Sequence, residues 1–187
     1  IVKGGGHGSY HNIVLAPGSA QEMCDFTILA FDLADKYRCT TVVLTDGCIG
    51  QMMEPVTFPD TVVPAPKKDW AVTGEAETRK NCITSIYMST ELLKDLNDRL
   101  QAKYAVIEKN EQRSEDFMTD DAELVVVAYG IMSRVAHNAI SELRAKGRKV
   151  GMVRPQTLFP FPKKRLQEVA GKAKAFLAAE MSAGQMA

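Results

Sequence analysis

The order of apolar and polar residues in the first third of the chain predicts a strand, a helix and a second strand. Residues 12–16 (NIVLA) form a short apolar run, typical of a buried strand, and a Pro-Gly pair ends it. Ser19 with Glu22 three positions later is a capping box, and apolar residues then recur at helical spacing to about residue 37. Residues 40–45 (TTVVLT) are β-branched and continuous, which predicts a strand buried on both faces. The order predicts a right-handed β-α-β unit with parallel strands.

The middle of the chain does not continue this pattern. Residues 61–82 carry prolines and a lysine pair without sustained periodicity, which indicates an extended surface connection. A helix is expected from Ser89 to about Phe117, with an apolar stripe as far as Ile107 and a charged, solvated end beyond it. The stripe is typical of a packing face, although a linker helix between two domains would show the same pattern.

The last third of the chain predicts a second β-α-β-α-β unit, so we expect an α/β protein with two separate units and parallel sheets. Gly147 follows the last helical turn, where a left-handed residue is favoured, and Arg154-Pro155 is expected to end a strand. The predicted elements are a strand at 123–129, a turn at Gly130, a helix from there to 146, a strand at 149–153, a proline-rich loop, a helix at 163–170 and a strand at 175–180.

Both ends of the sequence suggest a piece of a longer protein. The chain begins at Ile1 without an initiator methionine or a signal-peptide pattern. It ends at Ala187 directly after a predicted strand, which would leave an open apolar sheet edge. We therefore expect truncation at both ends.

Charge and composition exclude several classes of protein. Among 187 residues, 23 are Lys or Arg and 23 are Asp or Glu, and this neutral balance argues against a dedicated nucleic-acid binder. The 45% of hydrophobic residues argues against disorder, and no apolar run approaches the length of a membrane span. No pair of the four cysteines (Cys24, Cys39, Cys48 and Cys82) has CxxC spacing, so neither a zinc ribbon nor an iron–sulfur cluster is expected within this chain. Such sparse cysteines predict a reducing, cytoplasmic location.

Four features resemble ligand sites but have simpler interpretations. The GGGHG stretch at 4–8 precedes a strand, whereas a phosphate-binding loop lies between a strand and a helix, so a flexible loop is expected. His7 and His11 are four residues apart without a helix, and we predict no metal site there. His137 is expected to be a structural or surface residue. Ser19, Gly130 and Arg154 lie at strand ends, where α/β sheets place ligands, but caps and turns are the simpler interpretation.

The segment from Thr45 to Pro55 (TDGCIGQMMEP) carries the strongest functional signal. It follows a predicted parallel strand, and its two glycines permit sharp turns. Asp46 can accept hydrogen bonds from those turns, and Gln51 can both donate and accept. Because no nucleophile–base pair or carboxylate dyad can be assembled here, the residues alone indicate a loop at a functional edge.

Beyond these patterns, the sequence resembles a known family. Residues 13–55, from IVLAPGS to GQMMEP, closely resemble the α-type subunit of 2-oxoacid:ferredoxin oxidoreductases. The segments AYGIMSRVAHNAI, GMVRPQTLFPFP and AAEMSAGQM resemble the transketolase C-terminal-type domain of the same subunit. The 2-oxoisovalerate type is most similar, with Asn81–Tyr87 fitting that branched-chain type, and the 2-oxoglutarate type is next.

The resemblance implies a domain organisation. Residues 1–60 would form the end of a thiamine-diphosphate pyrimidine-type domain and 61–121 a connection with a long helix. Residues 122–187 would form an incomplete transketolase C-terminal-like domain.

The resemblance also implies oxidative decarboxylation of a branched-chain 2-oxoacid to acyl-CoA, with electrons passing to ferredoxin. Thiamine diphosphate and magnesium would be shared with a β-type subunit, and iron–sulfur clusters would lie on partner subunits, including ferredoxin-like and γ-type chains. No catalytic residue is expected in this chain, and no cofactor is expected to bind to this stretch alone. Asp46, Gly47, Gln51 and Met52 are candidates for the loop nearest the subunit interface and active cleft.

Two alternatives remain open. Gly130 and the strand ends also fit a non-catalytic Rossmann-like nucleotide-binding or assembly module. A third interpretation keeps the thiamine chemistry but replaces ferredoxin with transketolase or dehydrogenase partners.

Overall fold

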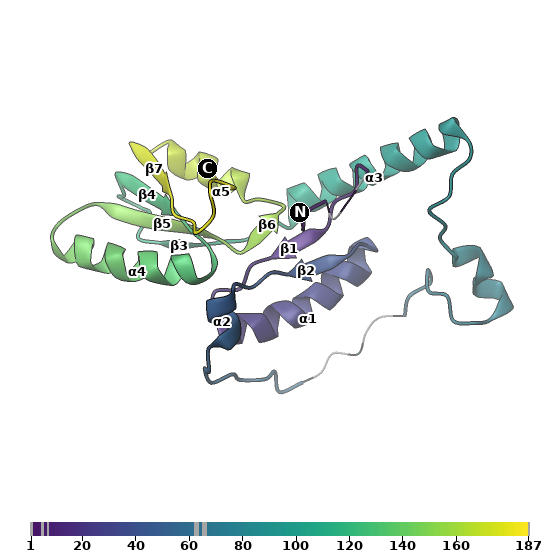
Figure 1. Ribbon diagram of the computed structural model, residues 1–187, viewed down its shortest axis with the longest axis horizontal. Coiled ribbons are helices and arrows are strands. Elements are labelled where there is room, and N and C mark those ends of the chain that lie inside the picture. Colours follow the sequence, from purple (N-terminus) through teal and green to yellow (C-terminus); the bar gives the residue numbers. More distant parts are fainter. Residues whose placement is uncertain (1, 5, 7, 62–63, 65–66, 187) are drawn as a thin grey trace.

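A computed structural model describes residues 2–4, 6, 8–61, 64 and 67–186. In this part of the chain the strands form two sheets, one of three strands and one of four (Figure 1). The α/β class is therefore confirmed. None of the described helices is both long and apolar enough to cross a membrane.

The first sheet has the order β2-β1-β6 and is built on the most buried segment of the chain. Its strands are β1 (Ile13–Leu15), β2 (Thr41–Val43) and β6 (Thr157–Phe159). Helix α1 (Ala20–Tyr37) connects β1 to its parallel neighbour β2 and packs Phe26 and Leu33 into the core with β1. The predicted β-α-β unit is confirmed. However, β2 lies at the sheet edge and is only partly buried, which corrects the expectation that both its faces are covered.

The second sheet has the order β3-β5-β4-β7. Its strands are β3 (Ser114–Phe117), β4 (Leu124–Val127), β5 (Val150–Pro155) and β7 (Ala175–Ala178). Helix α4 (Gly130–Ala145) covers one face and α5 (Lys163–Ala170) the other (Figure 1). Alternate residues of β4 reach these two layers, because Val126 packs with Ile140 of α4 whereas Val125 packs with Val169 of α5.

Each sheet contains one antiparallel strand that the sequence patterns did not predict. Strand β6 pairs antiparallel with β1, and β3 pairs antiparallel with β5. The sheets are therefore mixed, and β6 joins the first sheet although it follows β5 of the second. This strand exchange corrects the expectation of two separate units.

The long helix ends earlier than its charge pattern suggested. Helix α3 spans Thr90–Asn110, and the chain then turns at Glu111 to enter β3. Glu111 is 3% exposed and accepts hydrogen bonds from Lys36 Nζ at 2.7 Å and Tyr37 Oη at 2.5 Å. The charged end is thus exposed at residues 108–110, as expected, but Glu111 is a buried anchoring point between α3 and α1.

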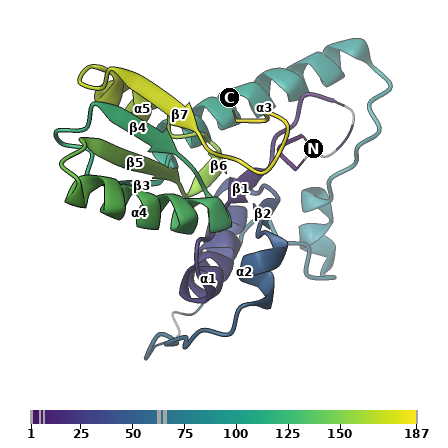
Figure 2. The same ribbon diagram turned by 60° about the vertical axis from the view of Figure 1, so that its left-hand side comes forward.

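The connection between the sheets is extended, with the short helix α2 (Gly47–Gln51) and a 3-10 helix (Ala76–Asn81) in it. Lys68 forms an ion pair with Asp35 of α1 at 2.5 Å, and the Trp70 ring packs under the Arg38 guanidinium at 5.0 Å. Figures 1 and 2 show that the first half of α3 extends beyond both sheets. Leu92 on that half is 58% exposed, so only the second half of the apolar stripe packs in the core.

Candidate functional site

The turn between β1 and α1 is held by a charged side chain from the other sheet. Arg154 of β5 donates to both carboxylate oxygens of Glu22, from Nη1 at 2.8 Å and from Nη2 at 2.6 Å. Its Nε donates to Glu115 of β3 at 2.7 Å, and only 7% of the Arg154 side chain is exposed. Glu22 also accepts from the backbone N–H of Gly18 at 2.7 Å. A Cβ on Gly18 would lie 2.8 Å from Arg154 Nη1, so a side chain at this position would force the Arg154 guanidinium to shift.

The ionisation of Glu22 reflects this arrangement. Burial opposes the charged form, but hydrogen bonds from Arg154 and Gly18 outweigh it and hold the pKa of Glu22 below its usual range. The predicted cap is confirmed, since Ser19 Oγ accepts from the backbone N–H of Glu22 at 3.1 Å. The carboxylate of Glu22, by contrast, bonds to Gly18 and not to the N–H of the cap residue that a capping box would use.

At the start of α4 the roles of the two units are reversed, because here a side chain of the first unit holds a turn of the second. One oxygen of Asp46, Oδ1, accepts from the N–H groups of Cys48 and Ile49 at 3.0 Å. The sequence indicated such an acceptor for the turns here, but not that it caps a helix, α2. The other oxygen, Oδ2, accepts from the N–H of Ile131 at 2.8 Å. Gly130 has φ +59, and a Cβ there would lie 2.6 Å from Asp46 Oδ2. One carboxylate thus caps two helices, and glycine is required at the point of contact.

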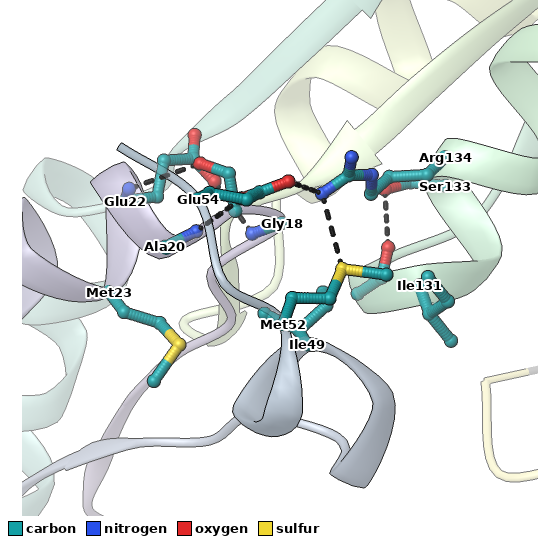
Figure 3. A network of polar contacts seen from close by, with 12 residues as sticks. Gly18, Ala20, Glu22, Met23, Ile49, Met52, Glu54, Ile131, Ser133 and Arg134 are labelled. Atoms are coloured by element: carbon teal, nitrogen blue, oxygen red, sulfur yellow. Dashed lines mark hydrogen bonds and ion pairs between the residues drawn. The ribbon is translucent and has the colours of Figure 1, made fainter. Parts of the chain in front are cut away.

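A third residue, Glu54, connects the beginning of α1 with α4 through its carboxylate (Figure 3). Glu54 Oε2 accepts from the N–H of Ala20 at 2.9 Å, and its Oε1 forms an ion pair with Arg134 Nη1 at 2.5 Å. The same Arg134 nitrogen lies 3.6 Å from Met52 Sδ. The bonds from Ala20 and Arg134 lower the pKa of Glu54.

A cavity of about 470 Å³ opens between the two helix starts. Ser19 and Glu22 of the first unit line one side, and Arg134 and Asn138 of α4 line another. His137 lies in the wall and stacks on Phe117 with 3.9 Å between ring centroids, in agreement with the surface or structural role expected for it. The positive charges of Arg134 and Arg154 are balanced by Glu22 and Glu115, so the cavity is polar without a strong excess of either sign.

The predicted loop residues separate into two groups. Asp46 and Met52 contact α4, as described above. Gly47 and Gln51 are exposed, and no atom lies within 4 Å of a Cβ placed on Gly47. Glu54 was not singled out from the sequence, although it lies within a segment that carried the family resemblance. Arg154 was noted only as a strand end, without a partner.

The remaining candidates do not join this site. His11 packs its ring between Tyr104 and Phe159, at 4.9 and 5.0 Å between centroids. Residues 5 and 7 lie outside the described residues, so the predictions for the glycine-rich loop and for a histidine pair there stay predictions.

Comparison with known proteins places this architecture in a class. Residues 8–119 match the family described as pyruvate flavodoxin/ferredoxin oxidoreductase, thiamine diphosphate-binding. Residues 122–187 match the pyruvate:ferredoxin oxidoreductase core domain II. The fold resembles 2-oxoglutarate:ferredoxin oxidoreductase from Magnetococcus marinus, with a TM-score of 0.77 and 20% identity over 95% of this chain and 36% of that one. That likeness concerns the fold alone.

Curated relatives narrow the class further. A ketoisovalerate oxidoreductase subunit from Methanothermobacter thermautotrophicus is 56% identical over 187 residues, covering all of this chain and 53% of that protein. A 2-oxoglutarate synthase subunit from Methanocaldococcus jannaschii is 32% identical over 207 aligned positions, covering 97% of this chain and 56% of that protein. The chain therefore belongs to the pyruvate flavodoxin/ferredoxin oxidoreductase family, and it spans about half the length of these relatives.

The described residues do not by themselves complete a diphosphate–metal site. Backbone N–H groups at helix starts are a usual diphosphate cradle, but here those of Ala20 and Ile131 already donate to Glu54 and Asp46. No group of three or more His, Cys, Asp or Glu side chains in the described part of the chain is placed to hold a metal ion. The same occupied N–H groups count against the alternative of a nucleotide-binding module.

Proposed function

We propose that this chain is part of the α-type subunit of a 2-oxoacid:ferredoxin oxidoreductase that acts on a branched-chain 2-oxoacid. The reaction would be oxidative decarboxylation to an acyl-CoA, with the electrons passed to ferredoxin. The observation that carries the proposal is the difference in identity, which is 56% to a ketoisovalerate subunit over the whole chain and 32% to a 2-oxoglutarate subunit.

The cofactors are proposed to lie mainly outside the residues described here. The family description names thiamine diphosphate, and the occupied helix starts favour a site completed by a β-type subunit. Magnesium would lie with the diphosphate, and iron–sulfur clusters would lie on ferredoxin-like or other partner subunits, including a γ-type chain. Coenzyme A would be the acyl acceptor. No catalytic step is assigned to a residue of this chain.

The contribution proposed for this chain is a rigid edge beside the active cleft. Asp46 and Met52 hold α4, whereas Gly47 and Gln51 are exposed on the same loop and are proposed to face the subunit interface. The domain boundaries at residues 60 and 121 stay a prediction, as does a cytoplasmic location. The latter is supported by four free cysteines, of which Cys48 and Cys82 are exposed.

The test is reconstitution of the complete enzyme. The full-length subunit is co-expressed with its β-type and smaller partners, and coenzyme-A-dependent reduction of ferredoxin is measured with 2-oxoisovalerate, 2-oxoglutarate and pyruvate. We expect the largest kcat/KM with 2-oxoisovalerate. Preference for 2-oxoglutarate would overturn the branched-chain assignment. Absence of coenzyme-A-dependent turnover with every 2-oxoacid would overturn the proposed function.

A further inference from the structure

The two units are joined by contacts of different strength. The β1–β6 and β3–β5 ladders are backbone pairings, and Arg154 forms a buried pair with Glu22 across them. Asp46 accepts three backbone N–H bonds and lies against Gly130. These contacts fix the second sheet to the first and leave little freedom between them.

Glu54 is attached differently. It makes one backbone contact, to Ala20, and one side-chain contact, to Arg134. Its side chain is 24% exposed and that of Arg134 is 42% exposed, so water can compete for both partners. Glu54 also lies on an extended segment after α2, whereas Asp46 is fixed at the N-terminus of that helix.

The position of Glu54 is what distinguishes it from an ordinary surface ion pair. Ala20 directly follows Ser19, which lines one side of the 470 Å³ cavity, and Arg134 lines another. The Glu54 carboxylate therefore ties two walls of the same cavity together (Figure 3). Loss of this tie would leave Arg134 Nη1 with its contact to Met52 Sδ but without an anionic partner, and it would release the first turn of α1 while both backbone ladders remained intact.

We propose that Glu54 is a positioning residue, which fixes the shape of the cavity between α1 and α4 by holding Ala20 and Arg134 at a set separation. Its effect on turnover rests on the proposed function, because the cavity lies at the carboxyl edge where α/β sheets bind ligands. Its effect on the start of α1 and on the Arg134 side chain does not depend on what the enzyme converts.

The experiment uses the full-length subunit in its assembled complex, with the variants Glu54→Ala and Glu54→Gln. Hydrogen exchange is measured at single amides of the two helix starts, together with kcat and KM for each substrate. In Glu54→Ala we expect the Ala20 amide to exchange roughly tenfold faster, because it loses a hydrogen bond to a charged group. The Ile131 amide should keep its rate, since its acceptor is Asp46. For at least one substrate, KM should rise by a larger factor than kcat falls.

Two controls separate positioning from general destabilisation. Glu54→Gln keeps an acceptor for Ala20 without the charge, and it should restore most of the protection at that amide. Asp98→Ala removes an exposed ion pair to Lys94 on α3, far along the chain from the cavity, and it should change neither the exchange nor the kinetics.

Three outcomes would overturn the positioning role of Glu54. Unchanged exchange at Ala20 in Glu54→Ala would overturn the proposal, as would equal acceleration at Ala20 and Ile131, which indicates general loosening. Faster exchange at Ala20 with unchanged kcat and KM would overturn the positioning role. If the unmodified complex converts no 2-oxoacid, the proposed function fails, whereas the exchange at Ala20 still tests whether Glu54 holds the helix start.

Discussion

Replacing Gly130 with alanine tests the contact between Asp46 and the start of α4. Gly130 has φ +59, and an added Cβ would lie 2.6 Å from Asp46 Oδ2, closer than non-bonded atoms approach. The left-handed conformation costs an alanine about 1–2 kcal/mol. The displaced carboxylate also loses its hydrogen bond from Ile131, which is worth about 1.5–3 kcal/mol for a charged acceptor. We therefore expect Gly130→Ala to lower the free energy of unfolding by about 2.5–5 kcal/mol.

Gly147 provides the matched control. It also has a positive φ, +76, at the end of α4, but no atom lies within 4 Å of its added Cβ. Gly147→Ala should therefore cost only the conformational strain, about 1–2 kcal/mol. The difference between the two variants measures the Asp46 contact.

The assay is equilibrium urea unfolding of the intact subunit, followed by circular dichroism. A double-mutant cycle adds Asp46→Ala, in whose background Gly130→Ala should cost no more than Gly147→Ala does. The reasoning is refuted if Gly130→Ala and Gly147→Ala are equally destabilising. It is also refuted if the cost of Gly130→Ala is the same with and without Asp46.

Three further predictions concern acid stability and the core. Because the pKa of Glu22 is lowered in the folded state, ionised Glu22 stabilises the fold fully above the unfolded pKa of about 4.3, and this stabilisation is lost as pH falls through the folded pKa. In unfolding experiments between about pH 5 and pH 2, Glu22→Gln should therefore lose less stability with falling pH than the unmodified protein does. Ile107 is fully buried, so Ile107→Ala should lower the free energy of unfolding by about 2–5 kcal/mol. Leu92 is 58% exposed, so Leu92→Ser should change it by no more than about 0.5 kcal/mol. Equal effects of the two variants in urea unfolding would contradict the packing. Thr157 is fully buried, and its Oγ1 accepts from the N–H of Arg113 at 3.0 Å; Thr157→Val should therefore lower the free energy of unfolding by about 1–3 kcal/mol, and an unchanged midpoint would argue against that bond.

Elements with strong local signals could be predicted from the sequence. Helix α1 begins directly after Ser19, whose side chain forms the predicted cap, and α4 ends before Gly147, which has the predicted positive φ. Strands β1 and β4 coincide with the short apolar runs assigned to them. In each case the information lies within a few residues of the element.

The two antiparallel strands, β6 and β3, could not be predicted from such local signals. Strand β6 has three residues between prolines, and its partner β1 lies more than a hundred residues earlier in the chain. Strand β3 (SEDF) has an exposed, charged middle and is stabilised by its pairing with β5. Both depend on partners that local periodicity does not contain.

The candidate site was predictable only in part. Asp46 was identified as an acceptor for its own turn, and its bonds to Cys48 and Ile49 confirm this. Its bond to Ile131, 85 positions away, depends on how the sheets are joined. Glu54 and Arg134 meet across 80 positions, and neither residue type is unusual in its own segment. Their role becomes visible only when both helix starts are placed side by side.

The exchange of strands has a consequence for synthesis of the protein on the ribosome. Val14 of β1 pairs with Phe159 of β6, so the first sheet cannot be completed until about 145 further residues have been added. At about 5–20 residues per second, β1 would wait about 7–30 s for its second neighbour. During that interval the edge of β1 that β6 will cover lacks its native partner, which makes it a segment where a chaperone or a misassembled copy could bind.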